Sequence, residues 1–317
     1  MTQPPSPAID RLIRSAWIDD DTLASQFIRF ELGEHAVGWL TPAFADALAR
    51  WPHIFARSAR SVRFTPPLDT PNDRSRADAI LATIVSGLAT AGVITGWRDE
   101  RYPIRAHIDL GAETLLHVER AAARAFGITS DAVHVNGVVA GAGGPRALWI
   151  ARRSAAKSID PGMRDNMIGG GVPAGLSIRE TLIKEAWEEA GLDAAMAATA
   201  TAGRRLRIRR IVPEGLQSEV IHVHDLVLAG DVMPCNQDGE VSGFERIDVD
   251  GVVALLERDA GDNERDGGAP GDSASEGRRS DCDPMTVDAS LVTLDWLERN
   301  RFITLPDSAA CRAVYWL

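Results

Sequence analysis

The chain has few cysteines, no long apolar run and no excess of positive charge. The three cysteines, Cys235, Cys282 and Cys311, stand far apart with no C-x-x-C pair, so the sequence predicts neither a structural zinc site nor a disulfide framework. Such sparse use is typical of a reducing compartment, and we expect a cytoplasmic protein. The sequence contains no run of about 18 apolar residues and no signal-peptide core, so we expect no membrane partner.

The charge balance excludes one class of partner. The chain has 34 Lys and Arg against 45 Asp and Glu, a formal net charge of −11. An acidic chain repels polyphosphate backbones, so nucleic-acid binding is not the expected role. A small phosphate ligand stays compatible, because it needs only local cations and a metal. Neither composition nor pattern distinguishes a monomer from a homodimer.

The pattern of elements predicts an α+β protein with two parts. Apolar residues make up 45% of 317 residues, enough for two cores. We expect a smaller N-terminal α+β module over 1–130 and a second domain over 131–317. Within the second domain, residues 259–283 contain no large apolar residue and are expected to form a disordered insertion.

Periodicity and cap residues predict the elements of each part. In the module we expect a loop over 64–76 and strands over 27–32 and 36–40. The helices expected there are 9–17, 22–26, 42–50, 77–91 and 113–126. In the second domain we expect strands over 133–139, 147–152, 205–212, 219–228 and 241–247, and helices beginning near 178, 249 and 286.

The stretch GGGVPAGLSIRETLIKEAWEEAGL, residues 169–192, carries the most chemical information. Its glycines let the backbone approach a ligand closely, so Gly170 and Gly171 are candidate substrate-binding residues. Ser177 followed by Glu180 is a capping box, which predicts a helix from about Ile178. Gly191 is expected to end that helix.

Three glutamates, Glu185, Glu188 and Glu189, fall on one stripe of this helix by their i, i+3, i+4 spacing. Like charges so close repel each other, and a divalent cation such as Mg²⁺ or Mn²⁺, bound by oxygen ligands, removes the conflict. Such a metal would also neutralise diphosphate oxygens and activate water. The alternative is a solvated acidic helix face without function.

With its glycines and terminal Gly-Leu, the stretch resembles the Nudix box, G-x5-E-x7-R-E-U-x-E-E-x-G-U with U apolar, aligned from Gly170. The resemblance implies a mixed β-sheet sandwiched by helices, and divalent metal held by Glu185, Glu188 and Glu189. It also implies hydrolysis of a diphosphate linkage in a nucleoside-diphosphate-like small molecule. Leu176 replaces the first Glu of the box and Lys184 replaces its Arg. The second function hypothesis is therefore a non-catalytic ligand-binding or regulatory module that keeps the fold.

A narrower resemblance accounts for both departures. Motifs such as DNMIGGGVPAGLS at 165–177 and EGLQSEVIHVHDL at 214–226 resemble the Nudix subfamily related to thiamine pyrophosphokinase, whose members carry an N-terminal extension. That resemblance implies thiamine diphosphate or its damaged analogues as substrate. Metal-dependent isomerisation of a diphosphate is a third reading, which product analysis would expose.

Further candidates lie outside the box helix. Glu188, Glu189 and Glu240 are the candidate catalytic residues, since a general base must take a proton from the attacking water. Arg152, Arg153 and Lys157 follow a predicted strand and are candidate ligands for phosphate oxygens; the alternative is a solvated strand end. His222 and His224 share a strand face without a third ligand at metal spacing, which favours structural roles.

Overall fold

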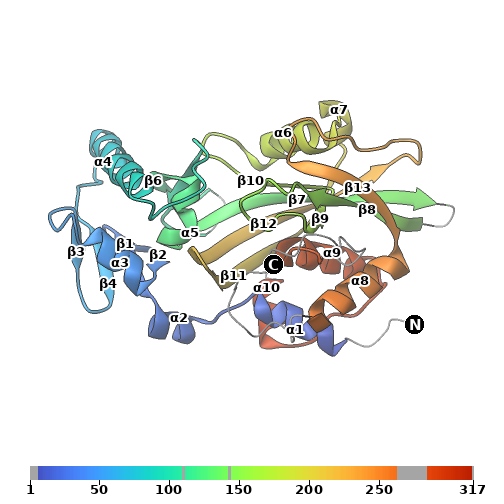
Figure 1. Ribbon diagram of the computed structural model, residues 1–317, viewed down its shortest axis with the longest axis horizontal. Coiled ribbons are helices and arrows are strands. Elements are labelled where there is room, and N and C mark those ends of the chain that lie inside the picture. The colour runs from blue at the N-terminus through green and yellow to red at the C-terminus, as the bar shows by residue number, and fades with distance from the viewer. Residues whose placement is uncertain (1–5, 109–110, 142–143, 263–283, 316–317) are drawn as a thin grey trace.

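The computed structural model describes residues 6–108, 111–141, 144–262 and 284–315. The chain forms an α+β protein in which a smaller α+β module packs against one edge of a larger domain with a mixed sheet, as the sequence predicts (Figure 1). Residues 263–283 of the expected insertion lie outside the described residues. Residues 259–262 were assigned to that insertion wrongly, because they continue helix α8 (Val249–Asp262).

The central sheet has seven strands, with the main path β11-β12-β7-β8-β13. Strands β12 and β7 run parallel while their neighbours run antiparallel, so the sheet is mixed. The strands are β7 (Thr129–Gly141), β8 (Gly144–Arg153), β9 (Arg164–Asn166), β10 (Ile168–Gly171), β11 (Thr201–Val212), β12 (Gly215–Leu228) and β13 (Val241–Asp248).

Strands β7 and β8 diverge, and this divergence positions the site. They pair from Gly137 to Gly141 of β7, near the hairpin turn. Beyond it, β10 pairs with β7 and β9 pairs with β8, so the two short strands fill the fork. The glycine stretch 169–171, expected as a loop, is therefore held as strand β10 beside the first half of β7.

Helices cover both faces of this sheet (Figure 1). Helices α6 (Ile178–Ala190) and α7 (Ala194–Ala197) cover one face, over a core that includes Val133, Val135 and Leu182. The other face carries α1 (Pro7–Ser15), α8, α9 (Val287–Arg299) and α10 (Ala309–Val314). The alternating side chains of the strands thus feed two separate cores.

The N-terminal module has its own core. In it, the ring centroid of Phe126 lies 5.0 Å from that of Phe30 and 5.0 Å from that of Phe44. A four-stranded sheet, order β2-β1-β4-β3, and a β5–β6 hairpin surround that core together with the module's helices. Its elements are α2 (Asp20–Gln26), β1 (Ile28–Leu32), β2 (His35–Leu40), α3 (Pro42–Leu48), β3 (Phe55–Arg57), β4 (Ser61–Phe64), α4 (Pro71–Thr90), β5 (Arg101–Arg105), β6 (Thr114–Glu119), η1 (Arg120–Ala122) and α5 (Ala123–Phe126).

Two expectations for this module were wrong. Residues 113–126 do not form one helix: 114–119 are strand β6, paired with β5, and helical turns occupy 120–126. Residues 71–76, assigned to a loop, are the first turns of α4. Thr70 caps that helix with a capping box and Pro71 stands at its first position, where a missing N–H costs nothing.

Helix α1 does not pack in the module's core, although it precedes the module in sequence. Ile9, Leu12 and Ile13 are buried against α8 and α10, on the far face of the central sheet. The predicted boundary at residue 130 stays a prediction. Among the described helices, none is long and apolar enough to cross a membrane.

Candidate active site

Helix α6 forms as its cap residues predict. Ser177 Oγ accepts a hydrogen bond from the Glu180 N–H at 3.2 Å, and Glu180 Oε2 accepts one from the Ser177 N–H at 2.8 Å. Gly191 ends the helix with φ of 65°, a left-handed conformation that favours glycine. Leu182 and Ala186 are buried against the sheet, which fixes the direction of the glutamate stripe beside them.

The three glutamates of that stripe have different surroundings. Glu189 is buried, and its Oε2 accepts a hydrogen bond from the Gly169 N–H at 2.7 Å. The side chain of Glu185 is 12% exposed and that of Glu188 is 36% exposed. The structure thus directs Glu185 and Glu189 inward, toward β10, and leaves Glu188 near the surface.

Lys184 links Glu185 to Glu188. Its Nζ lies 2.6 Å from Glu188 Oε2 and 3.1 Å from Glu185 Oε1, so one ammonium bridges both carboxylates. Within the described part of the chain, no three His, Cys, Asp or Glu side chains converge into a set that could hold a metal ion. Of the three predicted metal ligands, Glu185 and Glu189 lie against β10, and Glu188 is joined to Glu185 through Lys184.

The glycines of β10 allow this close packing. A Cβ at Gly170 would lie 2.6 Å from Glu185 Cγ, and one at Gly171 would lie 2.7 Å from Tyr102 Cζ and overlap its hydroxyl. Any side chain at either position would displace the glutamate or the tyrosine. The sequence predicts that Gly170 and Gly171 contact the substrate, and both residues line a cavity beside α6.

The charge of the inward pair is poorly compensated by the protein alone. Burial and the nearby charge of Glu185 raise the pKa of Glu189 to about 8. Burial also raises the pKa of Glu185, against the lowering effect of Lys184. Two adjacent buried carboxylates of this kind fit a hard divalent cation, which prefers oxygen ligands and would supply the missing positive charge.

Two of the three predicted phosphate-binding cations face the same cavity. Arg153 and Lys157 line it, whereas Arg152 points to the other side of β8, as strand alternation requires. Arg153 is held by Asp165 at 2.7 Å and by the carbonyl of Ile159 at 2.9 Å. These contacts fix the loop after β8.

Glu240 lies at the edge of the cavity and pairs with Lys157. It is therefore near the site, as expected of a candidate base. Burial lowers the pKa of Lys157, although the charge of Glu189 opposes this effect. Glu245 belongs to a different environment, where it pairs with Arg152 and Arg164.

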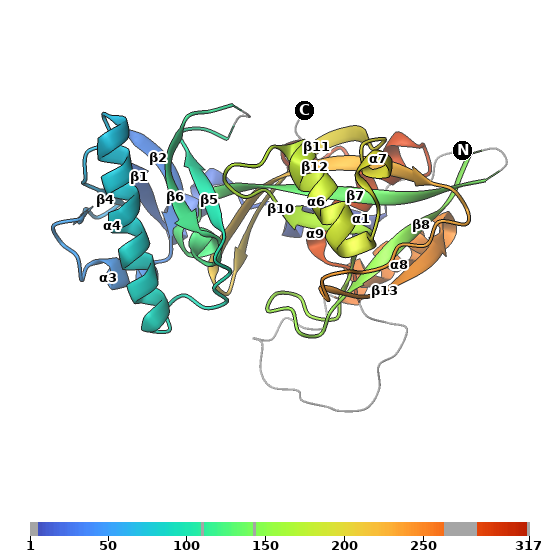
Figure 2. The ribbon, with the colours of Figure 1, turned by 90° about the horizontal axis from the view of Figure 1, so that it is seen from above.

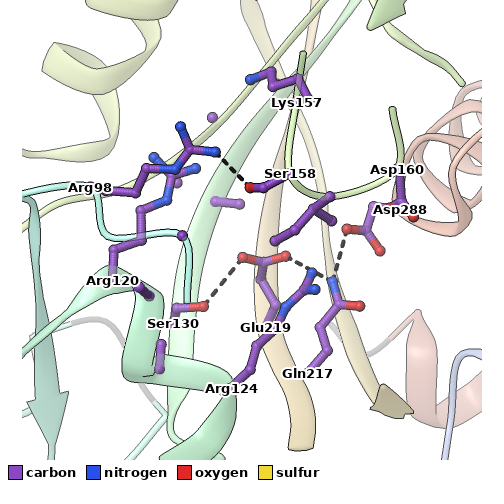
Figure 3. A pocket seen from close by; sticks show the side chains of 18 of the residues that line it. Arg98, Arg120, Arg124, Ser130, Lys157, Ser158, Asp160, Gln217, Glu219 and Asp288 are labelled. Carbon is purple, nitrogen blue, oxygen red and sulfur yellow. Dashed lines mark hydrogen bonds between the residues drawn. The ribbon is translucent and has the colours of Figure 1, made fainter. Parts of the chain in front are cut away.

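A cavity with about 220 Å³ of free space joins these groups to the N-terminal module. On one side lie Gly169–Gly171 and Glu185. On the other lie module residues that the sequence had not singled out: Arg98, Tyr102, Arg120 and Arg124 (Figure 3). No local motif marks these side chains, because only the docking of the module places them near α6.

The end of the cavity far from Lys157 holds the carboxylates of Glu219 and Asp288 together with Arg124 (Figure 3). Glu219 accepts a hydrogen bond from Ser130 Oγ at 3.2 Å, and Gln217 donates to Asp288 Oδ2 at 2.9 Å. Burial raises the pKa of Glu219, as does the neighbouring charge of Asp288. This end of the cavity therefore presents the carboxylates of Glu219 and Asp288 beside the guanidinium of Arg124.

The predicted structural role of the histidine strand holds for His222. Its Nε2 lies 2.8 Å from Asp131 Oδ1, and Arg105 of the module pairs with the other oxygen of the same carboxylate. Burial alone would raise the pKa of Asp131, but His222 and Arg105 outweigh it and lower the pKa. This buried group ties β5 to β7 and β12 below the cavity.

Comparison with known proteins gives this geometry a family. Residues 131–265 match the model described as "NUDIX domain", and residues 11–130 match "Domain of unknown function (DUF4743)". The chain is 33% identical over 299 residues to "Nudix hydrolase 20, chloroplastic" of Arabidopsis thaliana, across 92% of this chain and 72% of that protein. The chain belongs to the Nudix hydrolase family.

Other similarities are partial. "Nudix hydrolase 24, chloroplastic" of Arabidopsis thaliana is 37% identical over 235 residues, and the alignment spans 74% of this chain but 63% of that relative. The crystal structure of DR0079 from Deinococcus radiodurans aligns with a TM-score of 0.39 at 21% identity, over 62% of this chain and 99% of the other. The cytoplasmic location expected here stays a prediction.

The two departures from the Nudix box have distinct positions in the fold. Leu176 lies in the turn before α6 and is 36% exposed. Because leucine has no carboxylate, this position adds no oxygen ligand to Glu185 and Glu189. Lys184, at the box arginine, holds Glu185 and Glu188 as described. An ammonium makes these contacts as a point charge and lacks the planar fork of a guanidinium.

Proposed function

We propose that this Nudix hydrolase cleaves the diphosphate linkage of a small molecule in a reaction that depends on a divalent cation. The observation that carries the proposal is the inward pair Glu185 and Glu189, whose charge is poorly compensated, beside a cavity lined by Arg153 and Lys157. Carboxylates for a cation and cations for phosphate oxygens are the two requirements of diphosphate hydrolysis.

The residues have separate tasks in this proposal. Glu185 and Glu189 would hold Mg²⁺ or Mn²⁺, with Glu188 available once Lys184 releases it. Such a metal neutralises diphosphate oxygens and lowers the pKa of a water molecule. Lys157 and Arg153 orient the phosphate oxygens, and Glu240, beside Lys157, is our candidate base.

For the substrate we propose a nucleoside-diphosphate-like or thiamine-diphosphate-like molecule. The resemblance to the thiamine pyrophosphokinase-related subfamily motivates the second of these. The carboxylates of Glu219 and Asp288, at the end of the cavity far from Lys157, support it, since a carboxylate can complement a positively charged or amino-substituted heterocycle.

Phosphate release by the purified chain tests the proposal. The panel contains thiamine diphosphate, its oxidised analogues, ADP-ribose and several nucleoside di- and triphosphates, each with Mg²⁺ and with Mn²⁺. We expect turnover of one class, a loss of at least about 100-fold in Glu189→Gln, and no change in Glu257→Gln, an exposed glutamate of α8. Thermal unfolding of each variant verifies the fold.

The alternative is a ligand-binding module without turnover, and one observation favours it. Lys184 occupies two of the three predicted metal ligands. A wild-type chain that binds a panel member by calorimetry and never releases phosphate would establish the module. Turnover that Glu189→Gln leaves intact would contradict the proposed role of the glutamate pair.

A further inference from the structure

The hairpin β5–β6 docks the N-terminal module directly onto strand β10 and its surroundings (Figure 2). The carbonyl of Arg101 accepts a hydrogen bond from the Ala174 N–H at 2.8 Å, just after β10. Tyr102, the next residue, is buried with its hydroxyl against Gly171, and Arg105 pairs with Asp131. Three contacts along one strand thus hold the module as a fixed wall of the cavity.

Arg120 projects from this wall at the end of β6. Its Nη1 donates to Glu100 Oε2 at 2.7 Å, and its guanidinium lies 5.7 Å from the centre of the Tyr102 ring. Partial burial would lower the pKa of Arg120, but the charges of Glu100 and Glu185 raise it, so it stays cationic. The guanidinium is positioned by two neighbours and still faces the cavity.

Arg98 approaches from the segment after α4. Its backbone N–H donates to Glu119 Oε1 at 2.9 Å, which anchors the segment to the end of β6. Its Nη2 donates to Ser158 Oγ at 2.9 Å, in the loop that also carries Lys157 (Figure 3). Arg98 therefore spans from the module to the opposite side of the cavity.

Among the described residues, Arg153 of the Nudix domain is more heavily engaged than these two arginines. Arg153 donates to a carboxylate and to two carbonyls, and Lys157 pairs with Glu240. Arg98 makes one side-chain hydrogen bond to a neutral hydroxyl, and Arg120 makes one to a carboxylate. A guanidinium has five N–H donors, so both arginines retain donors that an anion in the cavity can accept.

We propose that the N-terminal module is a substrate-binding element, in which Arg120 and Arg98 bind the diphosphate group across the cavity from Glu185. The arginine fork matches phosphate oxygens in a bidentate manner, and the docked hairpin holds it ready. This inference rests on the proposed function for the identity of the ligand, and it gives Arg98 and Arg120 of the module a role in recognition.

Binding of imidodiphosphate, a diphosphate with a non-hydrolysable P–N–P bridge, tests the inference without turnover. Isothermal titration is run without metal and with Mg²⁺ on wild type, Arg120→Ala, Arg120→Lys, Arg98→Ala and the double alanine variant. We expect about 10- to 100-fold weaker binding in each alanine variant, the range for a lost hydrogen bond to a charged group. Arg120→Lys should be intermediate, because it keeps the charge and loses the fork.

Arg76→Ala is the matched control, since Arg76 is an exposed arginine of α4 in the same module. It should bind as wild type, and unchanged thermal unfolding shows that each variant keeps its fold. Arg98→Ala removes an exposed side chain and protects the test against a folding defect in Arg120→Ala.

The outcomes separate this inference from the proposed function. Wild-type affinity in the double variant overturns the inference, even if the chain hydrolyses diphosphates. Arginine-dependent binding without hydrolysis supports the inference while the proposed catalysis fails. If turnover occurs, a rise in KM at constant kcat in Arg98→Ala supports binding of the ground state.

Discussion

Replacing Gly171 by alanine tests whether Tyr102 of the module packs tightly against strand β10. A Cβ at this position would overlap the Tyr102 hydroxyl and lie 2.7 Å from its Cζ. Tyr102 is buried at 4% exposure and cannot swing into solvent without leaving its core. Overpacking of this kind costs about 1–3 kcal/mol, so we expect Gly171→Ala to lower the free energy of unfolding by that amount.

The measurement is urea denaturation of wild type, Gly171→Ala and Gly243→Ala. Gly243 also lies in a strand, β13, but a Cβ there meets no atom within 4 Å. That control should be neutral or slightly stabilising, because alanine restricts the unfolded chain. Comparing the two variants removes the general effect of replacing glycine.

A second substitution makes the cause specific. Tyr102→Phe removes the hydroxyl that the new Cβ would overlap, while Cζ stays close, so we expect the double variant to recover part of the loss, on the order of 1 kcal/mol. Equal stability of Gly171→Ala and Gly243→Ala would refute the packing argument. Failure of Tyr102→Phe to relieve the loss would show that Tyr102 is not the residue displaced.

Two further predictions concern stability. Asp131→Asn should cost about 3 kcal/mol near pH 7 in urea denaturation, because it leaves Arg105 and His222 without their buried carboxylate. Since His222 and Arg105 hold the folded-state pKa of Asp131 below its ordinary value, its contribution is present above the ordinary pKa and is lost as pH falls through the lowered pKa; a difference from wild type that does not shrink as the solution is acidified would contradict this. Ser177→Ala should lower stability by about 1 kcal/mol through loss of the α6 cap, and no loss would show that Glu180 alone suffices.

Local signals explain why α6 was predictable and β6 was not. The start of α6 rests on Ser177 and Glu180, whose hydrogen bonds are local, so the sequence predicts them directly. Residues 114–119 contain leucine and glutamate, which favour a helix, yet pairing with β5 makes them a strand. That pairing depends on a partner strand, and no pattern within the segment encodes it.

The candidate site divides in the same way. The helix stripe that carries Glu185 and Glu189 follows from spacing alone, and so does the opposite orientation of adjacent residues on a strand. Predicting that Arg152 points away from the cavity would have required knowing which face of β8 lies toward the cavity. The exposure of Glu188, in contrast to the burial of Glu189, depends on which side of α6 packs on the sheet.

The sequence by itself determined the family resemblance, the box helix and its caps, and the carboxylates for a metal, because each depends on residues within about one or two helical turns of each other. Tertiary structure alone decided that strand β10 presses its glycines against Glu185 and Tyr102, and that Arg98 and Arg120 enter the same cavity. Tyr102 and Gly171 are 69 positions apart in the chain. Their meeting is fixed by the docking of one module on another, whose contacts leave no periodic mark in the sequence.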